Sequence, residues 1–147
     1  MSWWTQFRTR VVVEKSDSFE TKDQIRSEIE QIFGKQCTYD SPRETWDDMW
    51  NNRDAYLPSG SEGTGVIEIH NGHYDEDDAR HSVWVIDIHG NLRDMYDNQE
   101  TEDWFNKSMR KLNETDRKMR YYSFYSESEC ETVCRKYRTW RRIIVTK

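Results

Sequence analysis

The chain has 147 residues, of which 28 are Asp or Glu and 22 are Lys or Arg, so its formal net charge is -6. A hydrophobic share of 34% is low for a globular protein, but 14% of the residues are aromatic. Because each buried ring removes roughly 150–250 Å² from water, the composition argues against a disordered chain and predicts one folded domain over residues 1–147.

Hydropathy and cysteine content bear on location. No stretch approaches the roughly 20 consecutive apolar residues of a membrane span, and residues 1–10 lack the apolar core of a secretory signal. We therefore expect a cytoplasmic protein with no membrane partner. The three cysteines cannot all pair with one another, so we expect reduced thiols.

The first part of the chain contains a strand and a long helix. Apolar residues alternate with charged ones over residues 7–13, which is the period of a half-buried strand. Thr21 followed by Gln24 is a capping-box pattern, and apolar residues then recur at helical spacing until Gly34. These patterns predict a strand over 7–13 and a helix over 22–33.

The segment before the next strand is too long for a plain connection. Ser41 with Glu44 forms another capping-box pattern, which predicts a short helix over 42–52. The Gly and Ser content of residues 55–65 predicts an exposed, turn-rich loop. The apolar face of the short helix is expected to reach the core through Trp46, Met49 and Trp50.

Strands and a helix follow in alternation. Period-two patterns predict strands over 66–70 and 82–89, and an apolar stripe predicts a helix that Thr101 caps. The aromatic run at 119–126 predicts another strand. Four tryptophans are expected to be mostly buried in the resulting core: Trp46, Trp50, Trp84 and Trp104.

The predicted order of elements defines the fold class. The first strands and the long helices match the ferredoxin-like split β-α-β-β-α-β pattern. Ser128 with Glu131 predicts an appended helix through Tyr137, and residues 141–147 predict an appended strand. We therefore predict an α+β fold with an antiparallel sheet, helices on one face, and an open polar opposite face.

Part of the chain resembles small uncharacterised proteins that phages and other mobile elements encode. The similarity lies in AYLPSGSEGT leading into a strand, in GNLRD, and in a helix that opens with DWFNK, and it covers residues 55–112. The resemblance implies an accessory or counter-defence protein that acts in the host cytosol. It implies no catalytic residue.

The histidines are the weak candidates for a metal site. All four lie between residues 70 and 89, and His70, His73 and His81 are close in sequence to four carboxylates. Imidazole and carboxylate groups bind zinc and other divalent ions, but this spacing matches no zinc-binding motif. We therefore expect a solvated acidic loop, with no bound metal and no other cofactor.

Signatures of catalysis are missing from the sequence. Cys37 has no recognisable base beside it, and the SGSEGTG segment lacks the Lys-Ser/Thr of a phosphate-binding loop. Paired carboxylates are common in an acidic chain and identify no hydrolase. We therefore expect a protein that is not an enzyme.

Charge is unevenly distributed along the chain. Residues 1–106 contain 23 Asp or Glu and 10 Lys or Arg, whereas residues 107–147 contain 5 and 12. The basic part either neutralises the acidic part within one fold or forms an anion-binding surface. The second alternative would use seven cations: Lys107, Arg110, Lys111, Arg135, Arg138, Arg141 and Arg142.

These features together predict a non-enzymatic binding protein. We expect an inhibitor or accessory factor of a mobile element, which binds a basic surface of a host or mobile-element protein through acidic and aromatic residues. Two alternatives remain open, namely a nucleotide or single-stranded nucleic-acid binding protein and the immunity protein of a toxin. The acidic residues of the expected binding surface are Asp75, Glu76, Asp77 and Asp78.

Overall fold

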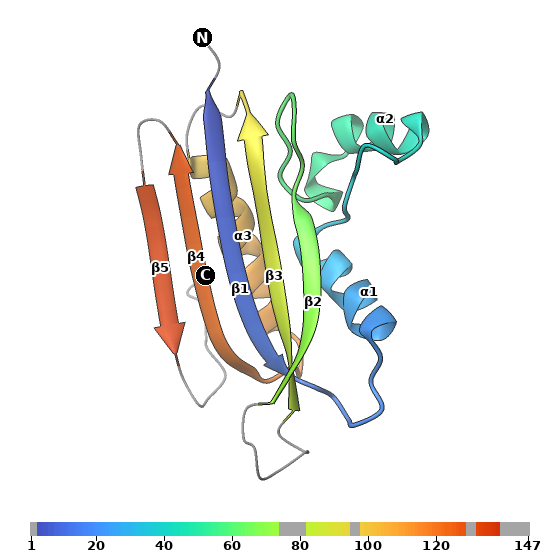
Figure 1. Ribbon diagram of the computed structural model, residues 1–147, viewed down its shortest axis with the longest axis vertical. Helices are drawn as coiled ribbons and strands as arrows, with labels where there is room; N and C mark the ends of the chain where they lie inside the picture. Colours follow the sequence, from blue (N-terminus) through green and yellow to red (C-terminus); the bar gives the residue numbers. More distant parts are fainter. Residues whose placement is uncertain (1–2, 74–81, 95–97, 129–131, 139–147) are drawn as a thin grey trace.

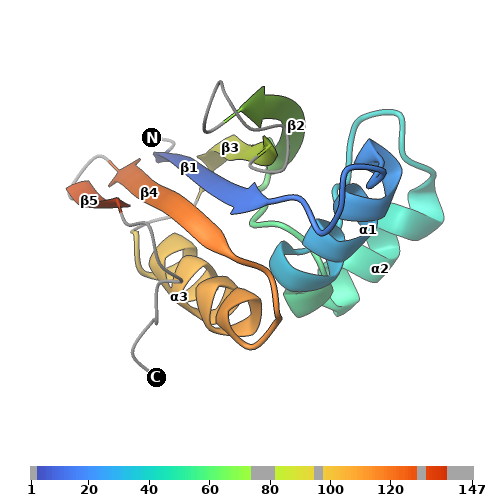
Figure 2. The ribbon, with the colours of Figure 1, turned by 90° about the horizontal axis from the view of Figure 1, so that it is seen from below.

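A computed structural model of the chain describes residues 3–73, 82–94, 98–128 and 132–138. These residues form one antiparallel sheet with helices on one of its faces (Figures 1 and 2). The strands are β1 (Trp4–Glu14), β2 (Val66–His73), β3 (Ser82–Arg93), β4 (Met119–Ser128) and β5 (Thr132–Arg138). The helices are α1 (Lys22–Phe33), α2 (Arg43–Asn51) and α3 (Gln99–Asn113), with a 3₁₀ turn, η1, at Arg53–Ala55. The prediction of an α+β fold with an antiparallel sheet is confirmed.

The strands lie in the order β2-β3-β1-β4-β5, and every pair of neighbours is antiparallel. In the chain, α1 and α2 lie between β1 and β2, and α3 lies between β3 and β4. Helix α3 lies behind the centre of the sheet, whereas α2 projects beyond the β2 edge (Figure 1). The sheet differs from a four-stranded split β-α-β-β-α-β sheet in its fifth strand, which pairs with β4.

Alternation along the strands separates the two faces of the sheet. In β1, Phe7 and Val11 are buried beneath the helices, whereas Arg8 and Arg10 are exposed on the opposite face. Successive strand residues point to opposite faces, so the period-two pattern of the sequence produces this division.

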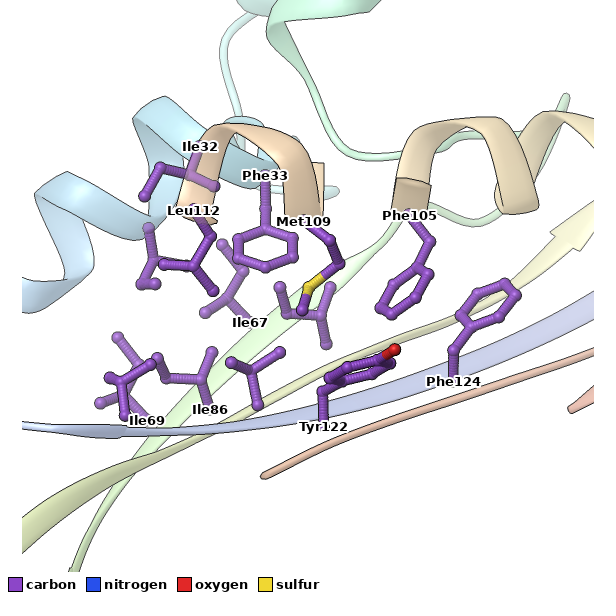
Figure 3. Packing of buried hydrophobic residues seen from close by; sticks show 14 of the residues in the cluster. Ile32, Phe33, Ile67, Ile69, Ile86, Phe105, Met109, Leu112, Tyr122 and Phe124 are labelled. Atoms are coloured by element: carbon purple, nitrogen blue, oxygen red, sulfur yellow. The ribbon is translucent and has the colours of Figure 1, made fainter. Parts of the chain in front are cut away.

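Aromatic rings supply much of the core (Figure 3). Phe105 of α3 stacks on Phe124 of β4 with ring centroids 4.5 Å apart. The indole of Trp104 meets Phe7 edge to face at 5.2 Å, and its Nε1 donates a hydrogen bond of 2.6 Å to the Phe33 carbonyl. Trp84 is 2% exposed, as predicted. A low aliphatic content therefore still yields a continuous apolar layer.

The caps of α1 follow the sequence pattern, but the other predicted caps do not. Thr21 and Gln24 exchange both hydrogen bonds of a capping box, and Gly34 ends the helix with a φ of 123°. The predicted capping box of α2 is wrong, because the Ser41 hydroxyl accepts a hydrogen bond from the Thr38 amide instead. Thr101 lies within α3, where its buried hydroxyl is 2.8 Å from that of Ser126.

The segment predicted as an exposed loop, residues 55–65, is largely packed against the end of β3. The Ser61 amide donates to the Arg93 carbonyl, and the Arg93 amide donates to the Glu62 carbonyl. A Cβ atom on Gly60 would lie 2.2 Å from the Arg93 carbonyl oxygen, so only glycine fits there. Six residues of the segment are buried: Tyr56, Leu57, Pro58, Ser59, Gly60 and Gly65.

The predicted appended helix is wrong. Its described residues form β5, which pairs with β4 from Glu127 opposite Thr132 to Tyr121 opposite Arg138. Thr132, Val133 and Tyr137 favour strands, and β4 offers an open edge whose backbone groups need partners. This edge outweighs the helical spacing of the sequence. The predicted final strand, residues 141–147, lies outside the described residues.

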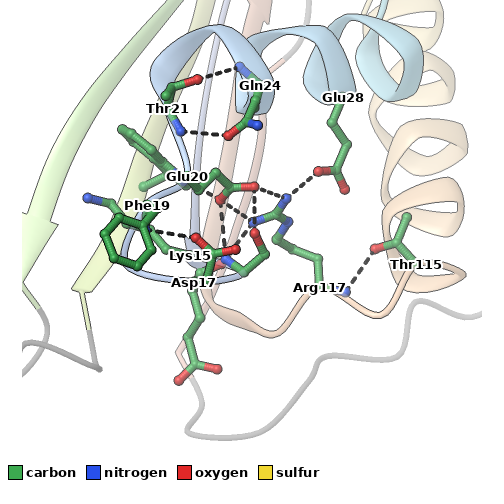
Figure 4. A network of polar contacts seen from close by, with 12 residues as sticks. Lys15, Asp17, Phe19, Glu20, Thr21, Gln24, Glu28, Thr115 and Arg117 are labelled. Atoms are coloured by element: carbon green, nitrogen blue, oxygen red, sulfur yellow. Dashed lines mark hydrogen bonds and ion pairs between the residues drawn. The ribbon is translucent and has the colours of Figure 1, made fainter.

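A buried ion network closes the end of the sheet near α1 (Figure 4). The Arg117 guanidinium donates to both oxygens of Glu20, at 2.7 and 2.8 Å, and also to Glu28. Nearby, Nη2 of Arg120 donates to one oxygen of Glu14. Part of the basic C-terminal segment thus neutralises N-terminal carboxylates inside the fold, as the first alternative for the charge distribution predicted.

Candidate functional site

The structure presents two surfaces with the chemistry of a binding site. The first is the helix-free face of the sheet, here called the open face. It comprises Arg8 and Arg10 of β1, Glu68 and His70 of β2, Asp87 and His89 of β3, and Tyr121, Ser123 and Tyr125 of β4. The second is the α2 surface, which comprises Tyr39, Asp40, Glu44, Asp47, Trp50 and Asp54.

Strand register arranges the open face in rows. One row, taken from β3 to β4, is His89, Arg8 and Tyr125. The next, taken from β2 to β4, is Glu68, Asp87, Arg10 and Ser123. The β1 and β4 half of the face therefore combines guanidinium groups with phenol rings, and the β2 and β3 half combines imidazoles with carboxylates. A hollow of about 560 Å³ lies over the centre of the face.

Ion pairs connect the two halves of the open face. The Arg10 guanidinium forms a two-pronged contact with Asp87, at 2.7 and 3.0 Å. This hydrogen bonding raises the pKa of Arg10 despite its partial burial. On the β2 side, His89 Nε2 lies 3.6 Å from Glu68 Oε2, and His70 Nε2 lies 4.0 Å from Asp87 Oδ2. No salt bridge of the described residues involves Arg8, so its charge is available to a ligand.

The α2 surface exists because the helix has little to pack against. Met49 is buried and Trp46 is half-buried in a small cluster with Cys37 and Tyr56. Trp50, which was predicted to reach the core, is instead 48% exposed. It is 100° around the helix from Met49, beyond the narrow stripe that this cluster covers.

Aromatic rings and carboxylates lie together on the α2 surface. Tyr39 is 87% exposed, and the Arg53 guanidinium lies 5.1 Å from the Trp50 ring, which restricts the indole. Residues 40–54 contain five carboxylates and two arginines. The neighbouring Tyr56 hydroxyl donates a hydrogen bond to Asp48, and this bond raises the pKa of Tyr56 to about 12. The surface is thus anionic and presents large rings to solvent.

The thiol in this region is buried. Cys37 is 1% exposed, and burial raises the pKa of its thiol. A raised pKa keeps sulfur in the unreactive protonated form.

The predicted site residues are distributed over several parts of the chain. His70 lies on the open face, whereas Lys107, Arg110 and Lys111 lie on α3, on the opposite side of the sheet. Lys107 Nζ is 3.9 Å from Asp54 Oδ2 at a cleft of about 200 Å³ between α3 and η1. Arg135 and Arg138 belong to β5, for which only the backbone is described. His73 ends β2, and the remaining candidates lie outside the described residues: Asp75, Glu76, Asp77, Asp78, His81, Arg141 and Arg142.

The α2 surface and the rows of the open face were not recognised from the sequence. The alternation in residues 7–13 indicated a charged open face, and the run at 119–126 indicated an aromatic strand. Only the register between β1 and β4 places Arg8 beside Tyr125. For α2, the excess of carboxylates around Trp50 was the available signal.

No protein-family model matches the chain, and no curated protein or solved structure matches it significantly. No helix in the described ranges is long and apolar enough to cross a membrane. The functional argument therefore depends on the two surfaces themselves.

Proposed function

We propose that this chain is a non-enzymatic binding protein that docks on a basic protein surface through the α2 surface. The observation that carries the proposal is the exposure of Trp50 on α2, a helix that projects from the sheet, and of Tyr39 in the turn before it, in a segment rich in carboxylates. Trp and Tyr are enriched among residues that dominate binding energy, since they bury large areas with few rotatable bonds. Carboxylates around them accelerate encounter with a basic partner.

An inhibitor or accessory factor of a mobile element is the protein class that this surface fits best. A compact anionic protein can occupy the basic groove of an enzyme that handles nucleic acids and thereby block it. The immunity protein of a toxin would use the same chemistry. The identity of the captured partner distinguishes the two, because a host enzyme supports the first and a toxin supports the second.

The test is a pull-down that compares the partner proteins bound by the wild type with those bound by two variants. Each variant lacks one tryptophan side chain. Trp50→Ala removes the ring at the centre of the α2 surface, and Trp4→Ala removes a ring of similar exposure, 38% against 48%, at the start of β1. A partner that binds the wild type and Trp4→Ala, but not Trp50→Ala, supports the proposal. Equal capture by all three proteins would place the binding surface elsewhere.

A second candidate function, binding of single-stranded nucleic acid, is favoured by the row that contains Arg8 and Tyr125. A guanidinium can neutralise phosphate while a phenol ring stacks on a base, which is how sequence-tolerant nucleic-acid surfaces work. The carboxylates of Glu68 and Asp87 oppose a polyanion over the other half of the face. This opposition, together with the net charge of -6, ranks this function second.

Fluorescence polarisation of a labelled oligonucleotide tests the second candidate. Arg8→Gln should weaken binding and reduce the slope of log affinity against log salt by about 0.7 for the lost phosphate contact. Lys22→Gln, a substitution of an exposed cation at the start of α1, is the matched control. Binding that depends equally on Lys22 and Arg8 would indicate nonspecific attraction.

We also propose that the first four strands and their helices form a ferredoxin-like split β-α-β-β-α-β arrangement. Support comes from the order β4-β1-β3-β2 within the sheet, and from α1 and α3, each of which links strands that are not neighbours. In this arrangement β5 extends the β4 edge.

A further inference from the structure

The β2 and β3 half of the open face brings one imidazole and two carboxylates together. Glu68 and His70 are two residues apart on β2 and share its open side, and Glu68 lies directly opposite Asp87 of β3. One ligand atom from each of these three residues lies within 4.8 Å of the others. The three side chains come from rigid, neighbouring strands and not from a loop.

The charges of this cluster favour a cation. Like charges directly opposite each other on neighbouring strands destabilise a sheet. The Arg10 guanidinium pairs with Asp87 from the β1 side, on the far side of Asp87 from Glu68. Glu68 and Asp87 therefore face each other directly across β2 and β3, and a cation bound between the two carboxylates would reduce their repulsion.

We propose that Glu68, His70 and Asp87 bind a divalent transition-metal ion, for which Zn²⁺ is the best match. Zn²⁺ bonds of about 2.1 Å in a tetrahedron place ligand atoms roughly 3.4 Å apart. The observed 4.0 Å between His70 Nε2 and Asp87 Oδ2 reaches this spacing through small side-chain rotations. An imidazole ligand favours Zn²⁺ over Mg²⁺ and Ca²⁺, which prefer all-oxygen sites.

The site is of the open, exchangeable kind. Three side-chain ligands leave at least one coordination position of the ion for water or for an external small molecule. The side chains of His70 and Asp87 are 55% and 21% exposed, so solvent reaches this position. The inference does not depend on the proposed docking function, because α2 contributes none of the three ligands.

Arg10 should compete with the metal. Its Nε and Nη2 atoms contact the two oxygens of Asp87, so the ion must share one carboxylate oxygen with a guanidinium. Removing the guanidinium should therefore strengthen metal binding. If the three side chains were only part of a cross-strand ion network, the same substitution would weaken that network and create no metal affinity.

Calorimetric titration of the full chain with Zn²⁺, in a mildly alkaline buffer that favours deprotonated metal ligands, tests the proposal. We expect one equivalent of Zn²⁺ to bind. His70→Gln should weaken the Zn²⁺ affinity at least tenfold, because loss of a residue that merely supports a metal ligand already costs about tenfold. Arg10→Gln should strengthen binding. The double variant His73→Gln with His81→Gln, which removes the two imidazoles nearest the acidic segment, should leave the affinity nearly unchanged, and Mg²⁺ should give no comparable binding.

Three results would overturn the proposal. The first is no Zn²⁺ binding by the wild type under these conditions. The second is an equal loss of affinity in His70→Gln and in the double variant His73→Gln with His81→Gln, which would indicate nonspecific attraction to imidazoles. The third is a loss in the double variant His73→Gln with His81→Gln while His70→Gln still binds, because the metal would then belong to the histidines nearer the acidic segment. Urea denaturation of each variant verifies that it is folded.

Discussion

Replacing Arg117 with methionine tests the buried ion network most sharply. Methionine keeps an unbranched apolar stem but removes the guanidinium, so Glu20, whose side chain is 7% exposed, would remain buried without its cation. Removing one partner of a buried ion pair costs about 3–5 kcal/mol. We therefore expect Arg117→Met to lower the free energy of unfolding near neutral pH by this amount, which is a large part of the roughly 5–15 kcal/mol that stabilises a domain.

The pH dependence of stability separates this effect from a simple loss of packing. In the wild type, burial would raise the pKa of Glu20, but hydrogen bonds from Arg117, Trp84 and Ser16 lower it from 4.5 to about 2. A lowered pKa contributes stability that is present above pH 4.5 and is lost as the pH falls toward 2, about 3 kcal/mol in all. In Arg117→Met, the Arg117 hydrogen bonds no longer oppose burial, so the pKa of Glu20 rises and the stability that its ionisation contributes above pH 4.5 shrinks.

Urea denaturation followed by tryptophan fluorescence, from neutral pH into the acid range, measures both effects. Lys118→Met removes an exposed cation from the neighbouring position and should change stability by at most about 0.5 kcal/mol. The double variant Arg117→Met with Glu20→Gln should recover part of the lost stability, because the buried carboxylate of Glu20 that would lack its cation is then removed as well. A wild-type free energy of unfolding in Arg117→Met, or an acid-range pH dependence as large as that of the wild type, would refute this reasoning.

Three further predictions concern the core, the packed loop and a buried phenol. Trp84→Ala should cost about 3–5 kcal/mol because its indole is buried, and an unchanged urea midpoint would contradict that assignment. Gly60→Ala should destabilise the protein by about 1–3 kcal/mol because the new Cβ meets the Arg93 carbonyl, whereas a wild-type Tm would show that the loop can move away. Spectrophotometric titration should find one tyrosine that ionises near pH 12, and this ionisation step should be absent from Tyr56→Phe. Since its pKa is raised from 10.0, the stability it contributes should be lost as the pH rises from 10.0 to about 12, and normal ionisation of every tyrosine would disprove the bond to Asp48.

Local chemistry explains which elements could be predicted from the sequence. The bounds of α1 depend on Thr21, Gln24 and Gly34, whose interactions are with residues at most four positions away. The faces of β1 follow from alternation within one strand. These features need no knowledge of what packs against them, so the sequence pattern and the structure agree.

Elements that depend on distant partners could not be predicted in the same way. Residues 132–138 carry both helical and strand patterns, and the open edge of β4 decides between them. Trp50 belongs to an apolar helical stripe, but the cluster beneath α2 covers only part of it. The row of Arg8 and Tyr125 joins strands that are more than a hundred residues apart, and no local spacing reveals that register.

The dissociation rate of the captured partner tests the central claim, that the α2 surface is the binding surface, most directly. Truncating an aromatic residue at the centre of an interface typically costs at least 2 kcal/mol, mostly through faster dissociation. The rate for Trp50→Ala should therefore exceed the wild-type rate about 30-fold, whereas the rate for Trp4→Ala should match the wild type. Equal dissociation rates for all three proteins would contradict the claim.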